Sequence, residues 1–401
     1  MQFFTDVKDS LVESSSKTKL LMALLALLSV AGIAAWIYQL VCGLGVTGMS
    51  NITSWGMYIA MFMFFVGLSA GAMIVASAAH VFNVEWLKKI TLPALICALV
   101  CICAGGLSIL IDLGGLPRVW RMLTGPNFAS PLLWDMCGIT LFLIVNVVFL
   151  VCAVKGNADG MTKVARVALP VAVLVLCVDA WIFGLQEARA WYSAIMAPIF
   201  IASACDSGLS LILLVLIALE KAGIFSIAKE TFTKIAGLLA TFIAIDAFLI
   251  GCEILTMAYP GGHESVALAH MVSGATAPYF WFEIIAGLLI PFLILVFAKN
   301  RENTTLVLVS AVLVIVGVFC KRMWLLLTSF ITPNVEGAPG ITLGGSHAAD
   351  GVGMWAIQGW YSASPVELII LVGMTALVAL ALIVLSKTFM KRTKELSGAA
   401  R

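Results

Sequence analysis

Long apolar stretches separated by short polar gaps make up most of the chain after residue 19. Each stretch has about twenty residues or more, the length that an α-helix needs to cross a bilayer at roughly 1.5 Å per residue. None has the short alternating segments that are typical of a membrane β-barrel. The pattern predicts ten membrane-spanning helices, at residues 20–41, 55–82, 90–111, 132–154, 166–187, 191–219, 234–259, 278–298, 305–330 and 366–386.

Composition excludes most other classes of protein. Apolar residues make up 62% of the 401 residues and charged residues 11%, whereas charged residues are about 25% of an average soluble domain. Neither a soluble globular domain nor a disordered chain has such a composition. The first apolar stretch is too long for the core of a signal peptide, so we expect an uncleaved helix there. The sequence therefore predicts an all-α integral membrane protein without a separate soluble domain.

Lysine and arginine residues set the expected orientation, because the cytoplasmic loops of membrane proteins carry an excess of them. With the N-terminus inside, eighteen of the 23 Lys and Arg residues fall on the inner side, and only Arg118, Arg121 and Arg189 on the outer side. The other two, Lys321 and Arg322, lie within the ninth span. The sequence therefore predicts a multi-pass protein of the cytoplasmic (inner) membrane, with both termini in the cytoplasm.

Residues that hold a redox centre do not occur in a suitable pattern. A bis-histidine haem needs two imidazoles at one depth on facing helices. His80 lies near the inner end of the second span, and the other three histidines lie in outer loops. The ten cysteines fall within spans or at their edges, without iron–sulfur or zinc spacing. We expect no haem, iron–sulfur cluster or metal site in this chain, so another subunit must carry any electrons.

Several segments of the second to fifth spans recur, in the same order, in the sixth to ninth spans. The matched pairs are PLLWD (131–135) with PYFWFE (278–283), RAW (189–191) with RMW (322–324), and GLSAG (67–71) with CDSG (205–208). The shared order predicts two similar four-helix bundles, spans 2–5 and 6–9, related by an axis along the membrane normal. Spans 1 and 10 are then two peripheral helices.

Ionisable residues within the spans are candidates for function, because burying such a group in a membrane is costly. Asp246 and Glu253 are seven residues apart and share one face of a helix, which gives a polar track from mid-membrane toward the outer side. Such a track suits a proton relay, but the same residues can also hold helices together through hydrogen bonds and ion pairs. The candidate residues of the proton path are Asp179, Glu187, Asp206, Asp246, Glu253, Glu283, Lys321 and Arg322.

Three segments of the chain stand out: residues 45–71, from GVTGM to GLSAG, then DLGGLPRVWR at 112–121 and SPLLWD at 130–135. Together they resemble the NrfD/PsrC-like polysulphide-reductase membrane-subunit family. Residues 45–71, from GVTGM to GLSAG, resemble the second helix of the family. DLGGLPRVWR at 112–121 resembles its Asp-Leu-Gly-Arg-Pro element, although Gly115 and Leu116 stand where the family usually has one arginine, which Arg118 could replace. SPLLWD at 130–135 resembles its Pro-x-x-Trp-Asp element. The similarity in layout extends over all ten spans, as in the ten-helix branch found in quinone-linked anaerobic respiratory complexes and alternative complex III.

The resemblance implies a membrane subunit that binds a quinone, most readily menaquinone, near the outer surface. It implies electron exchange with a ferredoxin-like iron–sulfur subunit on the outer face, and further catalytic subunits, a molybdoenzyme or a multihaem cytochrome. We expect the chain to contact the lipid bilayer and not to bind nucleic acid. Because a quinol loses protons with its electrons, Asp112 and Asp135 are the expected catalytic proton acceptors. The expected quinone-binding residues are Trp55, Tyr58, Ser69, Arg118, Trp120, Arg121 and Trp134.

Alternatives remain open at several of these positions. The tryptophans could instead form the aromatic belt at the membrane surface, and Ser69 could instead allow close helix packing. An ion or small-solute transporter would also have repeats and midplane acids, and in a non-catalytic membrane anchor the charges would be purely structural. The sequence alone does not settle whether the chain takes part in catalysis.

The expected organisation follows from the spans and the resemblance. Residues 1–54 form the cytoplasmic N-terminus and first helix, 55–190 the quinone-binding bundle, and 191–330 the second bundle with the candidate proton path. Residues 331–401 form an outer loop, the tenth helix and a cytoplasmic tail. The loop at 331–365 contains no lysine or arginine, and loops of this length are usually binding or lid elements, so we expect a partner to dock there.

Overall fold

The computed structural model describes residues 15–51, 53–186, 189–261, 263–331 and 361–399. Within these residues the regular structure is entirely helical. Ten of its helical segments are long and apolar enough to cross a membrane, which confirms the predicted class and number of spans. They are α2 (Ser16–Cys42), α3 (Met57–Val81), α5 (Thr91–Asp112), α7 (Pro131–Val154), α8 (Ala158–Gly184), α9 (Met196–Lys221), α10 (Lys229–Ala258), the run from α12 to α13 (Ala277–Leu295), α15 (Thr304–Ile331) and α16 (Pro365–Ala399).

The eighth span departs from a regular α-helix, which the sequence did not indicate. After α12 (Ala277–Trp281) the chain forms π turns in η3 (Phe282–Leu289) and then returns to α-helix in α13 (Ile290–Leu295). Pro291 at the start of α13 has no backbone N–H and interrupts the hydrogen-bond ladder there. Short π segments are frequent at functional sites, and this one contains the buried Glu283.

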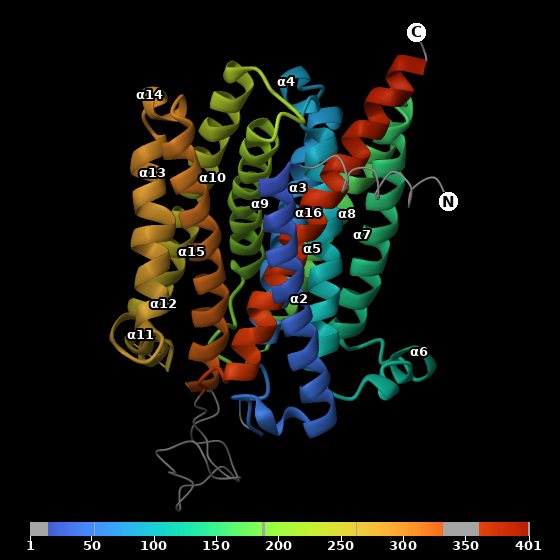
Figure 1. Ribbon diagram of the computed structural model, residues 1–401. Helices are drawn as coiled ribbons and strands as arrows, with labels where there is room; N and C mark the ends of the chain where they lie inside the picture. The colour runs from blue at the N-terminus through green and yellow to red at the C-terminus, as the bar shows by residue number, and fades with distance from the viewer. Residues whose placement is uncertain (1–14, 52, 187–188, 262, 332–360, 400–401) are drawn as a thin grey trace, which may run out of the picture.

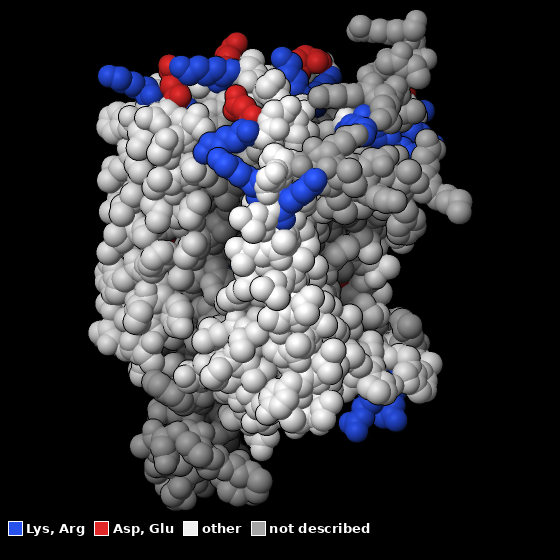
Figure 2. All heavy atoms as spheres, viewed as in Figure 1, with Lys and Arg blue, Asp and Glu red and all other residues white. Residues whose placement is uncertain are grey.

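The two ends of the molecule differ in charge. The start of α2 and the end of α16 lie at the same end, together with α4 (Glu85–Lys88) and α14 (Ala298–Arg301) (Figure 1). Lysine and arginine side chains gather at this end, whereas the opposite end shows few of them in the same view (Figure 2). We call these two ends the lysine-rich end and the lysine-poor end. Two short helices, α6 (Arg121–Thr124) and α11 (His263–Ser273), lie at the lysine-poor end (Figure 1).

Helices α3 and α9 form the centre of the molecule. Helix α3 packs against α5, α8 and α9, and α9 packs also against α10 and α15. The two central helices meet at Gly71 and Gly208, where a Cβ on Gly208 would lie 2.6 Å from the backbone of Gly71. Small residues allow such close approach of membrane helices. These glycines end the matched segments GLSAG and CDSG, but the grouping of the helices into two bundles stays a prediction.

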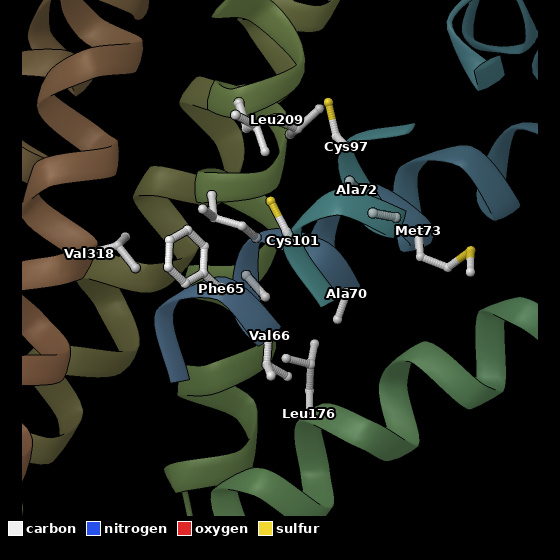
Figure 3. Packing of buried hydrophobic residues seen from close by; sticks show 14 of the residues in the cluster. Phe65, Val66, Ala70, Ala72, Met73, Cys97, Cys101, Leu176, Leu209 and Val318 are labelled. Atoms are coloured by element: carbon white, nitrogen blue, oxygen red, sulfur yellow. The ribbon is translucent and has the colours of Figure 1, made fainter. Parts of the chain in front are cut away.

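The interior around α3 is apolar. Figure 3 shows Phe65 and Val66 of α3 among side chains from the neighbouring helices, including Cys97 and Cys101 of α5. Both cysteines are buried and free, and they pack as small apolar side chains. The dispersion contacts of this cluster fix the positions of the helices that carry the polar residues described below.

Helices α2 and α16 pack on each other along the side of the molecule (Figure 1). They cross at Gly32 and Gly373, where a Cβ on Gly32 would lie 2.7 Å from the Cα of Gly373. Much of α2 is an exposed row of apolar side chains, as expected for a surface that faces lipid. Gln39 and Glu367 differ from this row, because both are almost completely buried. The two helices that we expected to be peripheral therefore each place a polar side chain in the interior.

Candidate functional site

Two groups of buried polar side chains stand out within the described residues. The first lies at the lysine-poor end, where α2, α3, α5 and α16 come together. Tyr58 of α3 is fully buried, and its hydroxyl donates a hydrogen bond to Gln39 Oε1 at 2.5 Å. Gln39 Nε2 in turn donates to the carbonyl of Ile111, one residue before Asp112, at 3.0 Å. We call this group the Tyr58 cluster; it consists of Gln39, Tyr58, Asp112, Tyr361 and Glu367.

Glu367, in the first turn of α16, accepts three hydrogen bonds. The donors are the backbone N–H of Gly48 at 2.8 Å, that of Ser364 at 2.8 Å and the Tyr361 hydroxyl at 2.6 Å. Tyr361 Oη also accepts a hydrogen bond from Met57 N at 3.0 Å. Burial and the nearby Glu367 carboxylate raise the pKa of the Tyr361 hydroxyl, so it stays protonated and donates. These bonds compensate for the burial of the carboxylate and tie α16 to the start of α3.

Asp112 is the last residue of α5, and the lining of an open groove begins one residue further along the chain. Its Oδ1 atom is buried and has no hydrogen-bond partner, and the carboxyl group interacts electrostatically with Tyr58 and Glu367. The residue that begins the groove, Leu113, follows Asp112 directly. The groove has a volume of about 400 Å³, within the usual range for ligand sites, and is lined by Leu44, Leu113, Gly114, Gly115, Arg118, Val119 and Met122.

The turn that shapes this groove depends on glycine. Gly114 has a φ of 61°, in the left-handed region that glycine adopts without a steric penalty. A Cβ at Gly114 would also lie 2.8 Å from Cγ of Leu44 on the opposite wall. The extra residues Gly115 and Leu116, which depart from the family pattern, lead into a short helical turn, η2 (Leu116–Arg118), that brings Arg118 to the groove.

The other expected quinone-binding residues lie elsewhere. Trp120 and Arg121 are exposed at the lysine-poor end, and neither lines the groove. Trp134 is 53% exposed, and its indole N–H donates to the carbonyl of Phe128 at 2.9 Å. The matched tryptophan, Trp281, is also exposed and donates in the same way to a carbonyl in the segment before its helix. An exposed indole anchored at a helix start is typical of the interfacial belt.

Trp55 and Ser69 make contacts that do not involve the groove. Trp55 stacks on Trp191, with ring centroids 6.3 Å apart, and its ring edge meets Phe183. The hydroxyl of Ser69 lies in the middle of α3 and donates to the carbonyl of Ala98 on α5 at 2.6 Å. The structure thus brings Tyr58, Asp112 and Arg118 to one region, and it does not bring the remaining expected residues there.

Sequence reasoning missed Gln39, Tyr361 and Glu367. The sequence could have identified Glu367 as a candidate, because it is an ionisable residue at the start of an apolar span. The indication for Gln39 is weaker, because it is an uncharged amide within an apolar helix. Nothing in the sequence distinguishes Tyr361 from other interfacial tyrosines.

The second buried polar group lies deeper, between α10, η3 and α15. Lys321 Nζ contacts the two carboxylate oxygens of Asp246 at 2.7 and 2.9 Å, and Glu283 Oε1 at 3.5 Å. The Trp324 indole N–H donates to the other carboxylate oxygen of Glu283. All three charged side chains have at most 2% of their surface exposed. A carboxylate in a membrane interior is stable only with such partners or with a proton.

Arg322 extends this group toward α8 and α9. Its Nη2 donates to Ser203 Oγ at 2.8 Å, and its guanidinium lies 3.9 Å from the ring centroid of Phe200. It interacts electrostatically with Asp179 on α8 and with Asp206 on α9, and all four carboxylate oxygens of these two residues lack a hydrogen-bond partner. We call this group the Lys321 cluster; it consists of Asp179, Asp206, Asp246, Glu283, Lys321 and Arg322.

The Lys321 cluster contains more acids than bases. Four carboxyl groups face two basic side chains, so the cluster is neutral when two of the carboxyl groups carry protons. A surplus charge within the membrane would cost several kcal/mol. Asp135, the expected acceptor on α7, is buried and interacts electrostatically with Asp179 rather than lining the groove. The arrangement can therefore store exchangeable protons near mid-membrane.

Glu253 lies apart from the cluster and accepts a hydrogen bond from Ser193 at 2.8 Å. A cavity of about 30 Å³ separates it from Lys321 and Arg322, and this volume is enough for about two water molecules. Glu187, another expected member of the path, lies outside the described residues. In the part of the chain that the structure describes, no three His, Cys, Asp or Glu side chains group closely enough to hold a metal ion.

Ten apolar helices with ionisable side chains buried between them define a multi-pass integral membrane protein. The family described as polysulphide reductase, NrfD, matches residues 45–334, and the chain belongs to this family. The resemblance inferred from the sequence is therefore confirmed.

Three relatives match over most of the chain. A putative dimethyl sulfoxide reductase membrane subunit of Halobacterium salinarum is 33% identical over 383 residues, which cover 90% of this chain and 88% of the relative. The Hdr-like menaquinol oxidoreductase integral membrane subunit of Archaeoglobus fulgidus is 26% identical over 366 residues, or 90% and 91% of the two proteins. One of the chains of the polysulfide reductase of Wolinella succinogenes is 28% identical over 311 residues, or 69% and 94%.

Proposed function

We propose that this chain is the quinone-interacting membrane subunit of a multi-subunit respiratory oxidoreductase, and that the groove beside Asp112 holds the quinone ring. Relatives described as membrane subunits of reductases and of a menaquinol oxidoreductase support this function. The observation that carries the site is the buried, unpartnered carboxylate oxygen of Asp112, the residue directly before Leu113 in the lining of a groove of ligand size. Menaquinone is the substrate we favour, because the relative from Archaeoglobus fulgidus is named for menaquinol.

The residues around the groove suit the proton chemistry of a quinol. A quinol that gives up two electrons also gives up two protons. Asp112 can accept one of them as a general base, and Arg118 can donate a hydrogen bond to a ring oxygen. Asp135 lies near Asp179 instead, so we assign it to onward proton transfer. The electrons pass to a ferredoxin-like iron–sulfur subunit at the lysine-poor end, and from there to a molybdoenzyme or multihaem cytochrome.

The distribution of basic residues supports the orientation of this site. Cytoplasmic loops are enriched in lysine and arginine, and these residues gather at the lysine-rich end (Figure 2). We therefore place the lysine-rich end, with the start of α2 and the end of α16, in the cytoplasm. The groove and the partner subunits then lie on the outer side.

We also propose that the Lys321 cluster conducts protons across the middle of the membrane. The surplus of acids over bases, and the unpartnered oxygens of Asp179 and Asp206, support this role. Glu253 and the small cavity beside Lys321 would continue the path toward the outer side. The competing explanation is that the same charges only hold α10, η3 and α15 together, and the two explanations give different results in the vesicle experiment described below.

Asp112→Asn in the purified complex tests the site. The variant keeps the size of the side chain but cannot accept a proton, so we expect the oxidation of reduced 2,3-dimethyl-1,4-naphthoquinone to slow by about 10²- to 10⁴-fold. Asp159→Asn, which changes an exposed acid at the start of α8, is the matched control. Wild-type rates in the Asp112 variant would remove the groove from the reaction. Purification of the chain as a lone oligomer, without redox subunits, would contradict the function itself.

A further inference from the structure

The side chain of Gln39 lies between Tyr58 and the end of α5. The last carbonyl groups of an α-helix have no partner within the helix, and Gln39 Nε2 supplies one for Ile111 at 3.0 Å. Because a carbonyl oxygen can only accept, this bond fixes which end of the amide faces Ile111. The remaining atom, Oε1, accepts the hydrogen bond of the Tyr58 hydroxyl at 2.5 Å. The single hydroxyl proton of Tyr58 is thereby committed to Gln39.

This arrangement leaves Asp112 without a donor. Asp112 follows Ile111 directly and interacts electrostatically with Tyr58. Its buried Oδ1 has no hydrogen-bond partner. Glu367, the other acid near Tyr58, already accepts three hydrogen bonds. If the Gln39 amide is removed, we expect the Tyr58 hydroxyl to turn toward Asp112, whose buried Oδ1 accepts no other hydrogen bond.

We propose that Gln39 is a positioning residue that holds the Tyr58 proton away from Asp112, so that the carboxylate stays open to a quinol hydroxyl. In the reaction both quinol O–H bonds break: Asp112 gains one proton, the other passes to solvent water at the open groove, and the two electrons leave for the redox centres of the partner subunits. A carboxylate that already accepts a hydrogen bond from Tyr58 is a weaker base, because that bond stabilises its charged form. The inference rests on the proposed role of Asp112, and it gives the first span a part in the site.

The test is a double-mutant cycle in the complete complex, with Gln39→Leu, Tyr58→Phe and both changes together. The measured quantity is the rate at which reduced 2,3-dimethyl-1,4-naphthoquinone reduces the redox centres of the partner subunits, followed by absorbance. We expect Gln39→Leu to lower the limiting rate about ten- to a hundredfold, which corresponds to one hydrogen bond to a charged group. The half-saturating quinol concentration should change much less. Adding Tyr58→Phe should recover most of the lost rate, because phenylalanine has no proton to donate to Asp112.

Recovery of the rate by the added Tyr58→Phe change distinguishes a positioning role of Gln39 from a general loss of structure. A purely structural role for Gln39 predicts that the double variant is as slow as Gln39→Leu or slower, and that result would overturn the proposal. Ser29→Ala removes another buried polar group of α2, one bonded within its own helix, and serves as the matched control. Gln39→Met provides a second variant of similar length if the leucine variant does not assemble. If Asp112→Asn slows the reaction but suppression is absent, the inference fails and the proposed function stands; if Asp112→Asn has no effect, the proposed site fails.

Discussion

Replacing Lys321 with methionine removes a cation that contacts two buried carboxyl groups. Lys321 Nζ lies 2.7 Å from Asp246 Oδ1 and 3.5 Å from Glu283 Oε1, and all three side chains have at most 2% of their surface exposed. Removing one partner of a buried ion pair typically costs about 3–5 kcal/mol, because the other charge stays buried without compensation. That cost is a large fraction of the total stability of most folded proteins. We therefore expect Lys321→Met to reduce strongly the amount of folded complex.

A second substitution tests whether the uncompensated carboxylate charge causes the loss of stability in Lys321→Met. Asp246→Asn removes the matching negative charge with little change in shape, so the carboxylate that Lys321 contacts most closely is no longer buried without its cation. The double variant Lys321→Met/Asp246→Asn should therefore regain most of the lost stability. The assay is thermal stability of the detergent-solubilised complex, measured as the fraction that still elutes as a single species after heating. A Lys321→Met variant as stable as the wild type, or a double variant less stable than both single variants, would refute this reasoning.

Three further predictions concern single positions. Gly71→Leu should prevent folding, because even a Cβ at this position collides with the Ala204 carbonyl. Gly106→Ala is the control in the same elution assay and should fold, because no atom lies within 4 Å of a Cβ at that position. Glu283→Gln should reduce proton uptake by proteoliposomes while electron transfer in uncoupled vesicles persists; full coupling in a stable variant would favour the purely structural role. Trp134→Phe should leave quinol oxidation within about twofold of wild type, since this exposed indole bonds a neighbouring carbonyl and lies outside the groove; a larger loss would return it to the site.

The spans could be predicted because the thickness of the bilayer imposes their length. A helix must present about twenty apolar residues to cross the hydrocarbon, so the stretches are visible without knowledge of any contact. The π turns of η3 were not visible in this way. They precede Pro291 and include Gly287, which lies in close contact with Gly317 of the neighbouring α15, where a Cβ on Gly287 would lie 2.7 Å from the Cα of Gly317. Such a contact depends on how two helices pack together, so the sequence of one span does not indicate it.

The candidate site could be predicted only in part for a similar reason. Sequence gives the depth of a residue along its helix, and in the structure Asp112 at the end of α5 and Tyr58 at the start of α3 lie near the same end of the molecule. It does not give the direction in which a side chain of a uniformly apolar helix points. Helix α2 is apolar on all sides, so Gln39 could not be assigned to the interior before its contacts with Tyr58 and Ile111 were known.

The close crossing of α3 and α9 also explains how residues of the two predicted bundles come to share one polar region. At the crossing, Gly71 and Gly208 bring the two backbones together. Four residues earlier on α3, a Cβ at Gly67 would lie 3.6 Å from Nη2 of Arg322, an ordinary contact distance, so this position lies directly beside the guanidinium. Arg322 can then bond to Ser203 of α9 while it interacts with Asp179 of α8. Small residues in the matched segments thus permit the close contact of α3 and α9, and this contact keeps the acids of α8 near the bases of α15, because a side chain at Gly71 or Gly208 would collide with the backbone of the other helix.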